Sequence, residues 1–260
     1  MKAGVLEAIA PELQMVEEKI AKYCRVRSGY LGEFAHLTVN SIDRYLRPAC
    51  VLLSARLFNQ GGEKVVALAS IIQLIFLAAK IHRDVPEKTS DNQAEPLDPR
   101  DGTQLPVLVG DYLYGRFFTT LCEGGILDFL KPLADIICKI NEGSILRLKA
   151  EAAGDFSEKT MLSIIEQETA SLLSGACRLS SILGQASAAD QEALSAFGHN
   201  LGMAYGILQE NGDRDLAGHF GALALAGLDR LKECASLQEL RQVLDSLVGK
   251  QKPLARIMVG

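Results

Sequence analysis

Four carboxylates stand at the ends of two expected helices, where their type and spacing could support metal chemistry. Asp84 and Glu87 follow one helical stretch, and Glu210 and Asp213 follow another. Carboxylate oxygens are the hard ligands that Mg²⁺ takes in proteins, and acids one turn apart share a helix face. The four acids could therefore hold one ion weakly. The alternative is that they are solvated side chains near helix ends.

The residues around these acids weaken the metal hypothesis. Arg83 stands at the start of the first acidic cluster. Its guanidinium would repel a divalent cation and is placed to pair with Glu87 instead. Pro86 disfavours helical geometry in the residue before it, and Gly212 favours a helix end before Asp213. Neither cluster is therefore expected to form a strong metal site.

One apolar helix must position the first acidic cluster. Residues 65–81 are apolar except for Ser70, Gln73 and Lys80, and they run into His82. A helix that is apolar on all sides is surrounded either by other helices or by lipid. The stretch is short for a membrane span, which needs about 20 residues, and the rest of the chain supplies partner helices. We expect a buried core helix and no membrane span.

The remainder of the chain also has the pattern of helices. Apolar residues recur at helical spacing, and no run shows the alternation of a β-strand. Pro48 is expected in the first turn of its helix, where proline is tolerated. Helices are expected at residues 5–26, 47–58, 105–122, 126–152, 155–183, 188–210, 216–231 and 236–247. This predicts an all-α fold with a single domain over residues 1–260 and a long polar loop at 87–104.

Composition excludes several classes of function. The net charge is −5 and no basic stripe is present, so nucleic acid is not an expected partner. The six cysteines are scattered without a CxxC pair, and the four histidines do not cluster with them. Neither a zinc site nor a disulfide framework is therefore expected. With no signal-peptide pattern at the start of this sequence, we expect reduced thiols in a cytoplasmic protein.

The order of short motifs resembles the trans-prenyl diphosphate synthases, or polyprenyl synthetases. That family carries a GGKRxRP turn, a helix ending in LIHDDxxD, an RRG loop, a GDxL helix start, a GE pair, a KTASL segment and an FQxxDDxxD helix. The corresponding segments are RYLRP at 44–48, LIFLAAKIHRDVPE at 74–87, RDG at 100–102, GDYL at 110–113, EGS at 142–144, ETASL at 168–172, and residues 197–213. The resemblance implies an isoprenoid-synthase-type helical bundle around a central cavity.

The resemblance also implies a chemistry. In the family, an allylic diphosphate ionises to a carbocation that isopentenyl diphosphate captures, and Mg²⁺ neutralises the leaving diphosphate. The implied diphosphate ligands are Arg44, Arg47, His82 and Arg100. Arg47 and His82 have structural alternatives, as hydrogen-bonding residues at a helix start and a helix end. The implied cavity wall is Phe76, Ala78, Ala79 and Tyr205. Its alanines would leave a tunnel open, and they equally suit close helix packing.

The chain departs from the family at charged positions. Arg83 and Gln209 replace the leading aspartates of the two acidic motifs. Family cations are replaced by Tyr45, Asp101, Glu168 and His219. A diphosphate would therefore meet repulsion where the family supplies attraction. The resemblance is thus to a divergent member lacking both Asp-rich motifs, whose vestigial metal ligands are Asp84, Glu87, Glu210 and Asp213. No cofactor is expected, and Mg²⁺ only if activity remains.

We expect a degenerate polyprenyl diphosphate synthase-like protein of isoprenoid biosynthesis that acts as a non-catalytic or regulatory subunit. Because family members dimerise through a helical face, the expected assembly is a homodimer or a heterodimer with an active prenyl diphosphate synthase. One alternative is an active prenyltransferase that condenses allylic diphosphates with isopentenyl diphosphate. The other is a protein that binds an isoprenoid or another lipid without catalysis. An isoprenoid diphosphate remains a candidate ligand.

Overall fold

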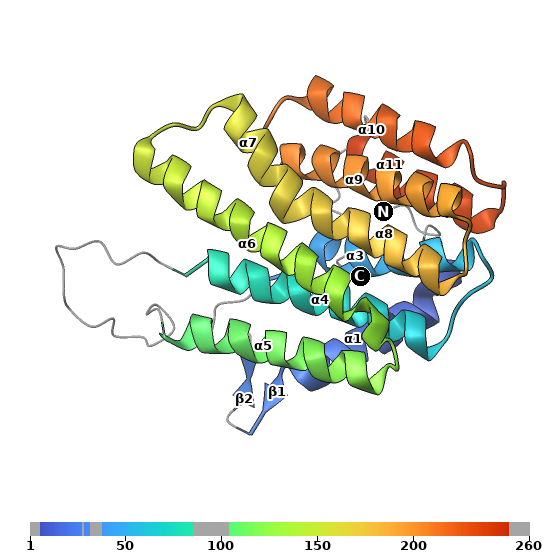
Figure 1. Ribbon diagram of the computed structural model, residues 1–260, viewed down its shortest axis with the longest axis horizontal. Helices are drawn as coiled ribbons and strands as arrows, with labels where there is room; N and C mark the ends of the chain where they lie inside the picture. The colour runs from blue at the N-terminus through green and yellow to red at the C-terminus, as the bar shows by residue number, and fades with distance from the viewer. Residues whose placement is uncertain (1–5, 28, 32–37, 86–103, 250–260) are drawn as a thin grey trace, which may run out of the picture.

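A computed structural model of the chain describes residues 6–27, 29–31, 38–85 and 104–249. Short 3₁₀ turns precede α1 and α6, and a π-helical turn separates α7 from α8 (Figure 1). The elements are η1 (Glu7–Ile9), α1 (Ala10–Tyr23), β1 (Arg25–Val26), β2 (Gly29–Tyr30), α3 (Ser41–Arg56), α4 (Glu63–Arg83), α5 (Gln104–Glu123), η3 (Leu127–Phe129), α6 (Leu130–Ala153), α7 (Glu158–Ile165), η4 (Glu166–Ala170), α8 (Ser171–Leu183), α9 (Ala188–Gln209), α10 (Arg214–Leu228) and α11 (Ala235–Val248).

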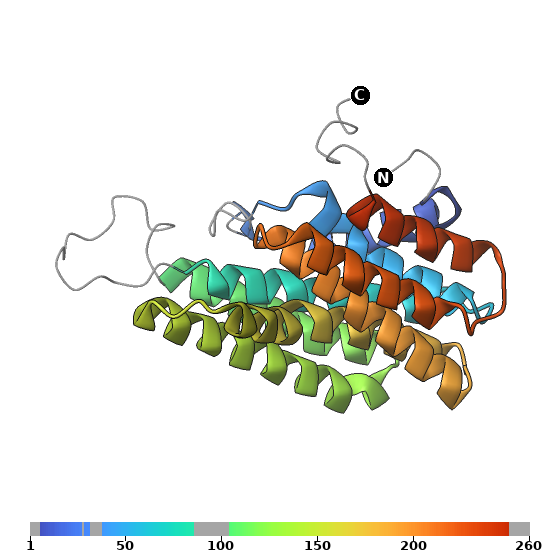
Figure 2. The same cartoon turned by 90° about the horizontal axis from the view of Figure 1, so that it is seen from above.

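The all-α prediction is confirmed, with one small addition. The strands β1 and β2 form a two-stranded antiparallel hairpin, in which Arg25 pairs with Tyr30 and Val26 pairs with Gly29. Seen from above, α11 and α6 lie on opposite sides of the bundle, with α3 and α4 between them (Figure 2). The extent of the domain over residues 1–260 stays a prediction.

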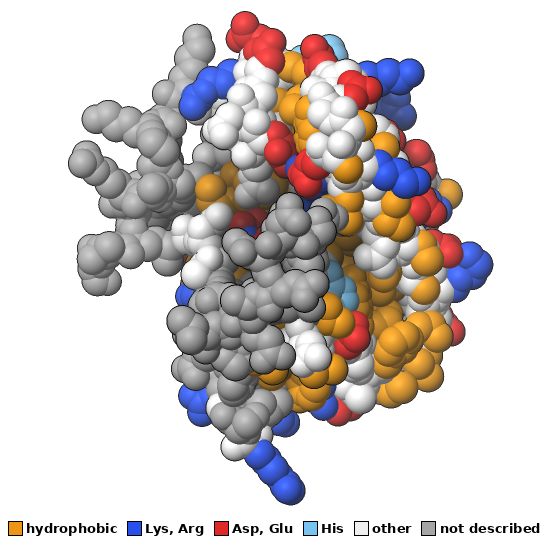
Figure 3. All heavy atoms as spheres, turned by 90° about the vertical axis from the view of Figure 1, so that its left-hand side faces the viewer, with side chains coloured by type: hydrophobic (Ala, Val, Ile, Leu, Met, Phe, Trp, Pro, Cys, Tyr) orange, Lys and Arg blue, Asp and Glu red, His pale blue; other side chains and the backbone are white. Residues whose placement is uncertain are grey.

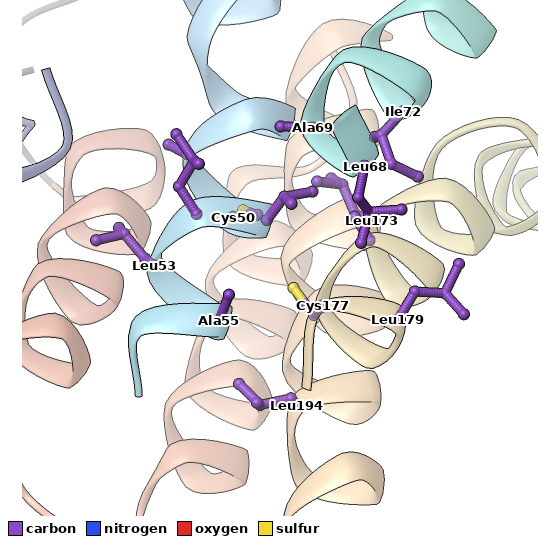
Figure 4. Close-up of a cluster of buried hydrophobic side chains, with 14 of the residues drawn as sticks. Cys50, Leu53, Ala55, Leu68, Ala69, Ile72, Leu173, Cys177, Leu179 and Leu194 are labelled. Atoms are coloured by element: carbon purple, nitrogen blue, oxygen red, sulfur yellow. The ribbon is translucent and has the colours of Figure 1, made fainter. Parts of the chain in front are cut away.

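Helix α4 is the buried core helix predicted from residues 65–81. It is long and apolar enough to cross a membrane, but 83% of its most apolar window is buried inside the molecule. It packs against α1, α3, α5, α6 and α8. Figure 4 shows the core that it shares with α3, α8 and α9, where Leu68 of α4 lies beside Leu173 of α8. The apolar surface of this helix is therefore covered by other helices of the same chain.

Helix α3 begins earlier than the sequence predicted. The side chain of Asn40 accepts a hydrogen bond of 2.8 Å from the amide of Asp43 and so caps the helix at Ser41. Pro48 therefore lies inside the helix and not in its first turn. The prediction failed because it started the helix at Arg47 and overlooked the capping asparagine. As a result, both Asp43 and Arg47 belong to one helical face.

The segment predicted as one helix over residues 155–183 is divided. Ser157 caps α7 by accepting from the amide of Thr160 at 3.2 Å. The π-helical turn η4 then interrupts the regular ladder before α8 begins at Ser171. A π-turn fits extra backbone into the helix and changes the direction of the side chains on it. In this turn Glu168 faces the interior, where it is 8% exposed.

Candidate functional site

A small cavity lies near the C-terminal end of α4, where the family motifs converge. Its volume is about 30 Å³, and it is lined by Arg47, Phe76, Ala79, Lys80, Arg83, Ile140, Ser144, Glu168, Thr169, Leu172 and Gln209. That volume holds about two water molecules. Binding sites for drug-sized ligands occupy about 300–1,000 Å³. The cavity at this end of α4 is therefore much smaller than a binding site for a drug-sized ligand.

Glu168 is the central charged residue of this site. Its carboxylate accepts a hydrogen bond from Arg147 Nη2 at 2.9 Å and one from Ser144 Oγ at 3.0 Å. Arg83 Nη1 lies 3.4 Å from the same carboxylate. The Glu168 side chain is only 4% exposed, so water screens these charges little. Two guanidinium groups from different helices therefore neutralise one buried acid.

Gly143 lets these groups approach one another. A Cβ atom on Gly143 would lie 2.9 Å from both Gln167 Cβ and Glu168 Cγ. Glycine at this position of α6 therefore allows the π-helical turn to pack directly on the helix. Ser144 and Arg147, which follow on α6, are then within reach of Glu168.

Arg147 also binds the end of α9. Its Nη2 donates to Glu210 Oε1 at 2.7 Å, so this guanidinium bridges Glu168 and Glu210. Burial lowers the pKa of Arg147, but the hydrogen bonds and charges of the two carboxylates outweigh this effect and raise the pKa above its ordinary value. Arg147 therefore remains charged, and the ion-pair network of Arg83, Arg147, Glu168 and Glu210 joins α4, α6, η4 and the end of α9.

Arg47 belongs to a second buried network beside the cavity. Its Nη1 lies 3.1 Å from Asp43 Oδ1, and its guanidinium stacks 3.5 Å from the centroid of Phe76. Tyr205 donates to the same Asp43 oxygen at 2.8 Å. Burial and then the charge of Asp43 raise the pKa of the Tyr205 hydroxyl. The guanidinium of Arg47 is thus bound to Asp43 and Phe76 within the fold, although Arg47 also lines the cavity.

The other implied diphosphate ligands lie away from the cavity or outside the described residues. Arg44 is exposed and lies 3.8 Å from Glu17 on α1. His82 Nε2 is 3.3 Å from both Asp111 Oδ1 and the Val107 carbonyl, so it joins α4 to α5. Arg100 falls outside the described residues.

The acids implied as metal ligands are each bound by protein groups where the structure describes them. Lys80 holds Asp84 at 2.9 Å, and Asp213 caps α10 by accepting from the amide of Asp215 at 2.8 Å. Glu210 is bound to Arg147, and Glu87 lies outside the described residues. Within residues 6–27, 29–31, 38–85 and 104–249, no three His, Cys, Asp or Glu side chains could hold one ion. The acids in this part of the chain do not fit a magnesium cluster.

The implied cavity wall is only partly present. Phe76 and Ala79 line the small cavity. In contrast to the expectation, Ala78 packs in a separate core cluster with Leu113, and Tyr205 is not among the lining residues because its hydroxyl is bound to Asp43. Arg83 lies 3.4 Å from Glu168 in the structure. The expected pairing of Arg83 with Glu87 stays a prediction, because Glu87 lies outside the described residues.

Arg147 is the residue that the sequence analysis missed. It lies 21 residues before Glu168 in the chain, and no basic cluster marks its position. One signal was present, because Arg147 follows Gly143 by four residues and so lies on the same face of a helix as the implied GE segment. Asp43 was also missed, because the sequence analysis overlooked the capping Asn40 and started this helix only at Arg47.

Comparisons with known proteins bear on the family of the chain and not on the contacts of this site. Residues 29–210 match the family model for polyprenyl synthetase. The octaprenyl diphosphate synthase of Escherichia coli is 25% identical over 211 residues, which cover 81% of this chain and 61% of that protein. Component 2 of the heptaprenyl diphosphate synthase of Geobacillus stearothermophilus is 27% identical over 203 residues, covering 78% of this chain and 63% of that protein. The chain thus spans somewhat over three-fifths of the length of these relatives.

Solved structures share the fold. A decaprenyl diphosphate synthase from Rhodobacter capsulatus superposes with a TM-score of 0.80 at 23% identity, covering 94% of this chain and 97% of that one. The geranyl diphosphate synthase small subunit from Antirrhinum majus gives 0.72 at 15% identity, covering 94% and 99%. At these identities the likeness establishes the fold alone. Because the family model covers most of the sequence, the chain belongs to the polyprenyl synthetase family.

Proposed function

We propose that this chain is a non-catalytic subunit that associates with an active prenyl diphosphate synthase. The observation that carries the proposal is the buried carboxylate of Glu168, held between Arg83 and Arg147. In the family motifs, an aspartate stands at the position of Arg83 and a lysine at that of Glu168. Cationic guanidinium groups repel divalent cations, and the buried acid repels a diphosphate. The charges at this site therefore neutralise one another within the protein.

The names of two relatives support a role as a subunit. One is component 2 of a heptaprenyl diphosphate synthase, and another is the small subunit of a geranyl diphosphate synthase. Both names describe parts of synthases built from different chains. The active-enzyme alternative is supported by relatives named as synthases, such as the octaprenyl diphosphate synthase. The cavity of about 30 Å³ argues against the lipid-binding alternative.

Exposed apolar side chains on α5 and α6 provide the surface for association. Hydrophobic side chains gather at the lower right of Figure 3, where these two helices lie. On α5 and α6, the most exposed hydrophobic side chains are Leu108, Phe118, Ile145 and Leu148. A patch of exposed apolar side chains marks a protein interaction site. The proposed partner is therefore an active synthase that covers this face, with a second copy of this chain as the alternative. We propose a cytoplasmic location for the complex.

Two measurements on the full chain test the proposal. The chain alone, supplied with farnesyl diphosphate, isopentenyl diphosphate and Mg²⁺, should give no prenyl product. Mixed with the active polyprenyl diphosphate synthase of the same organism, it should form a complex in analytical ultracentrifugation and change the chain length or yield of the products. The matched control is the variant Phe118→Glu, which should not associate.

Either measurement can overturn the proposal. Prenyl product formed by the chain alone would establish the active-enzyme alternative if two conditions hold. The activity must stay with the chain through every purification step, and EDTA must abolish it. The second measurement uses the synthase at a concentration on the order of 1 μM and the chain at roughly 10-fold excess. If no complex forms under these conditions, the chain is not a subunit of that synthase.

A further inference from the structure

The outer face of α5 contains a glycine that no contact among the described residues explains. Gly115 lies in the middle of the helix and is exposed. A Cβ atom added to it would have no other atom within 4 Å, and its backbone does not have the positive φ that favours glycine. Glycine in the interior of a helix destabilises that helix relative to alanine. Within the described residues, nothing offsets this loss of stability.

Most other glycines of the described helices are explained by close packing inside the chain. A Cβ atom on Gly198, for example, would collide with the carbonyl of Leu173. Gly218 of α10 is the comparable exception, because an added Cβ atom would also meet open space there. Its neighbours one turn earlier are the exposed charged residues Arg214 and Asp215. Gly218 therefore lies on a face that suits water, and it serves as a reference for Gly115.

The neighbours of Gly115 on its face of α5 are apolar. Tyr112 and Phe118 lie three positions before and after it, and Leu108 and Cys122 lie seven positions before and after it. All four side chains are exposed. Residues at these spacings share one face of a helix. Gly115 is therefore a gap between two aromatic side chains, on an apolar face that is about 21 Å long at 1.5 Å per residue.

The charged side chains of α5 contact other parts of the same chain. Asp111 Oδ1 lies 3.3 Å from His82 Nε2 on α4. The guanidinium of Arg116 lies 4.1 Å from the centroid of the Tyr23 ring, and Glu123 accepts a hydrogen bond of 3.3 Å from the Tyr23 hydroxyl. No other residue of α5 is charged. The outer face of α5 therefore offers a partner an almost uncharged surface, with Asp111 at its edge.

The gap at Gly115 favours a helix over a lipid surface as the occupant of this face. Helix α5 packs against α4 and lies at the lower edge of the bundle in Figure 1. Lipid chains adapt to any exposed apolar surface, so they do not require a gap in it. Two packed helices do, because the distance between their axes, about 8–10 Å, depends on the side chains at the point of contact.

We propose that the partner synthase places an uncharged helix across α5 at Gly115, where the missing side chain lets the two helices approach closely. Tyr112 and Phe118 then pack on either side of the crossing, as aromatic side chains do at the centres of protein interfaces. The inference rests on the proposed association with an active synthase. It adds the point of contact and the kind of element that covers α5.

The variant Gly115→Ala tests the crossing with two measurements on the full chain. The melting temperature of the free chain should rise by about 1–4 °C, because alanine favours the helix and its methyl group meets no other atom. The affinity for the active polyprenyl diphosphate synthase of the same organism, measured by analytical ultracentrifugation, should fall at least about tenfold, because the methyl group keeps the two helices apart. A residue with only a structural role would change both quantities in the same direction.

The matched control is Gly218→Ala, which should also raise the melting temperature but leave the affinity unchanged. If Gly115→Ala binds the synthase with wild-type affinity, the crossing at Gly115 is wrong although the chain is a subunit. If the wild-type chain forms no complex, the proposed function and this inference both fail. Weakened self-association with unchanged synthase binding would assign the face to a second copy of the chain. Binding to phosphatidylcholine vesicles in place of a complex would assign it to lipid, and either result would overturn the inference.

Discussion

Glu168 is the residue on which the charge balance of the closed site depends. It is the acid shared by Arg83 and Arg147, and the only neutral donor to its carboxylate among the described residues is Ser144. Two cations facing one buried acid repel each other as soon as that acid is neutralised. A residue that reverses a family charge has therefore become a structural counter-ion.

Neutralising this acid should destabilise the fold. The substitution Glu168→Gln keeps the shape of the side chain but leaves two guanidinium groups without their counter-ion. Breaking a buried ion pair costs about 3–5 kcal/mol, and because Arg83 is one-third exposed we expect about 2–4 kcal/mol here. Urea denaturation measures it. The control Glu166→Gln changes an exposed acid of the same turn, and an equal loss there would contradict the network.

Arg83 and Glu168 should also show energetic coupling. Each of the single variants Arg83→Asp and Glu168→Lys places like charges together. The double variant restores an opposite pair, with the acid on α4 and the base on η4, which is the family's order of sign. A double-mutant cycle should therefore give an interaction energy of at least about 1 kcal/mol. Additive effects of the two changes would mean that the contact of 3.4 Å carries no energy.

A third prediction concerns Glu239 on α11. Burial raises the pKa of this carboxyl, and the charge of Arg56 only partly opposes the shift. A raised pKa in the folded state means that the folded chain binds the proton more tightly than the unfolded chain. The charged form therefore destabilises the fold above the raised pKa, and this loss disappears as the pH falls below the unfolded value near 4.3. Glu239→Gln should raise the melting temperature at pH 7 and not at pH 4. Glu192→Gln, which changes an exposed acid, should have no such effect.

The sequence could identify the altered charges but not their contacts. Arg83 and Glu168 each stood out as a reversal of sign against the family motifs, yet they are 85 residues apart. Only the packing of both α4 and η4 on α6 brings them together. The direction in which Glu168 points depends on the π-helical turn, and nothing in the local sequence ETASL separates that turn from a regular helix. The candidate ligands could thus be listed, but not joined into a network.

At the scale of elements, the apolar pattern was sufficient for most helices. The core helix was predicted within a few residues of its observed ends because its apolar run is almost unbroken. Helices α6 and α9 were predicted equally well because their apolar residues recur at helical spacing over five or more turns. The errors occurred at helix ends that are set by a single side chain or by a tertiary contact. Asn40 sets the start of α3, and the division between α7 and α8 follows from packing on α6 and α9.

Close packing of α9 on η4 leads to a prediction at this scale. A Cβ atom on Gly202 would lie 2.5 Å from Ala170 Cα, which is backbone and cannot rotate away. Gly202→Ala should therefore destabilise the fold by about 1–3 kcal/mol, as overpacking does. The matched control is Gly218→Ala on α10, where nothing lies within 4 Å of the added atom. There alanine should stabilise the helix by about 0.5–1 kcal/mol. Loss of stability in both variants would rule out a specific contact.

At the scale of the whole molecule, two hollows formed by the described residues differ greatly in volume. The cavity at the end of α4 measures about 30 Å³, whereas the groove on the outside of α6 and α8 measures about 930 Å³. Ligand sites in enzymes need an enclosed volume, and protein partners need surface. This difference in volume is one reason for the proposal that the chain acts as a subunit.

The association surface supplies the last prediction. Phe118 is 53% exposed and Ile145 is 52% exposed, on α5 and α6 respectively. Buried apolar anchors at the centre of an interface each contribute about 2 kcal/mol or more. Glutamate at both positions should therefore weaken association with the synthase, or with a second copy of the chain, by at least about 100-fold. Leu223→Glu places the same charge on exposed α10 and should leave association unchanged. If the double variant forms the complex with wild-type affinity in a sedimentation experiment, the interface must lie elsewhere than on α5 and α6.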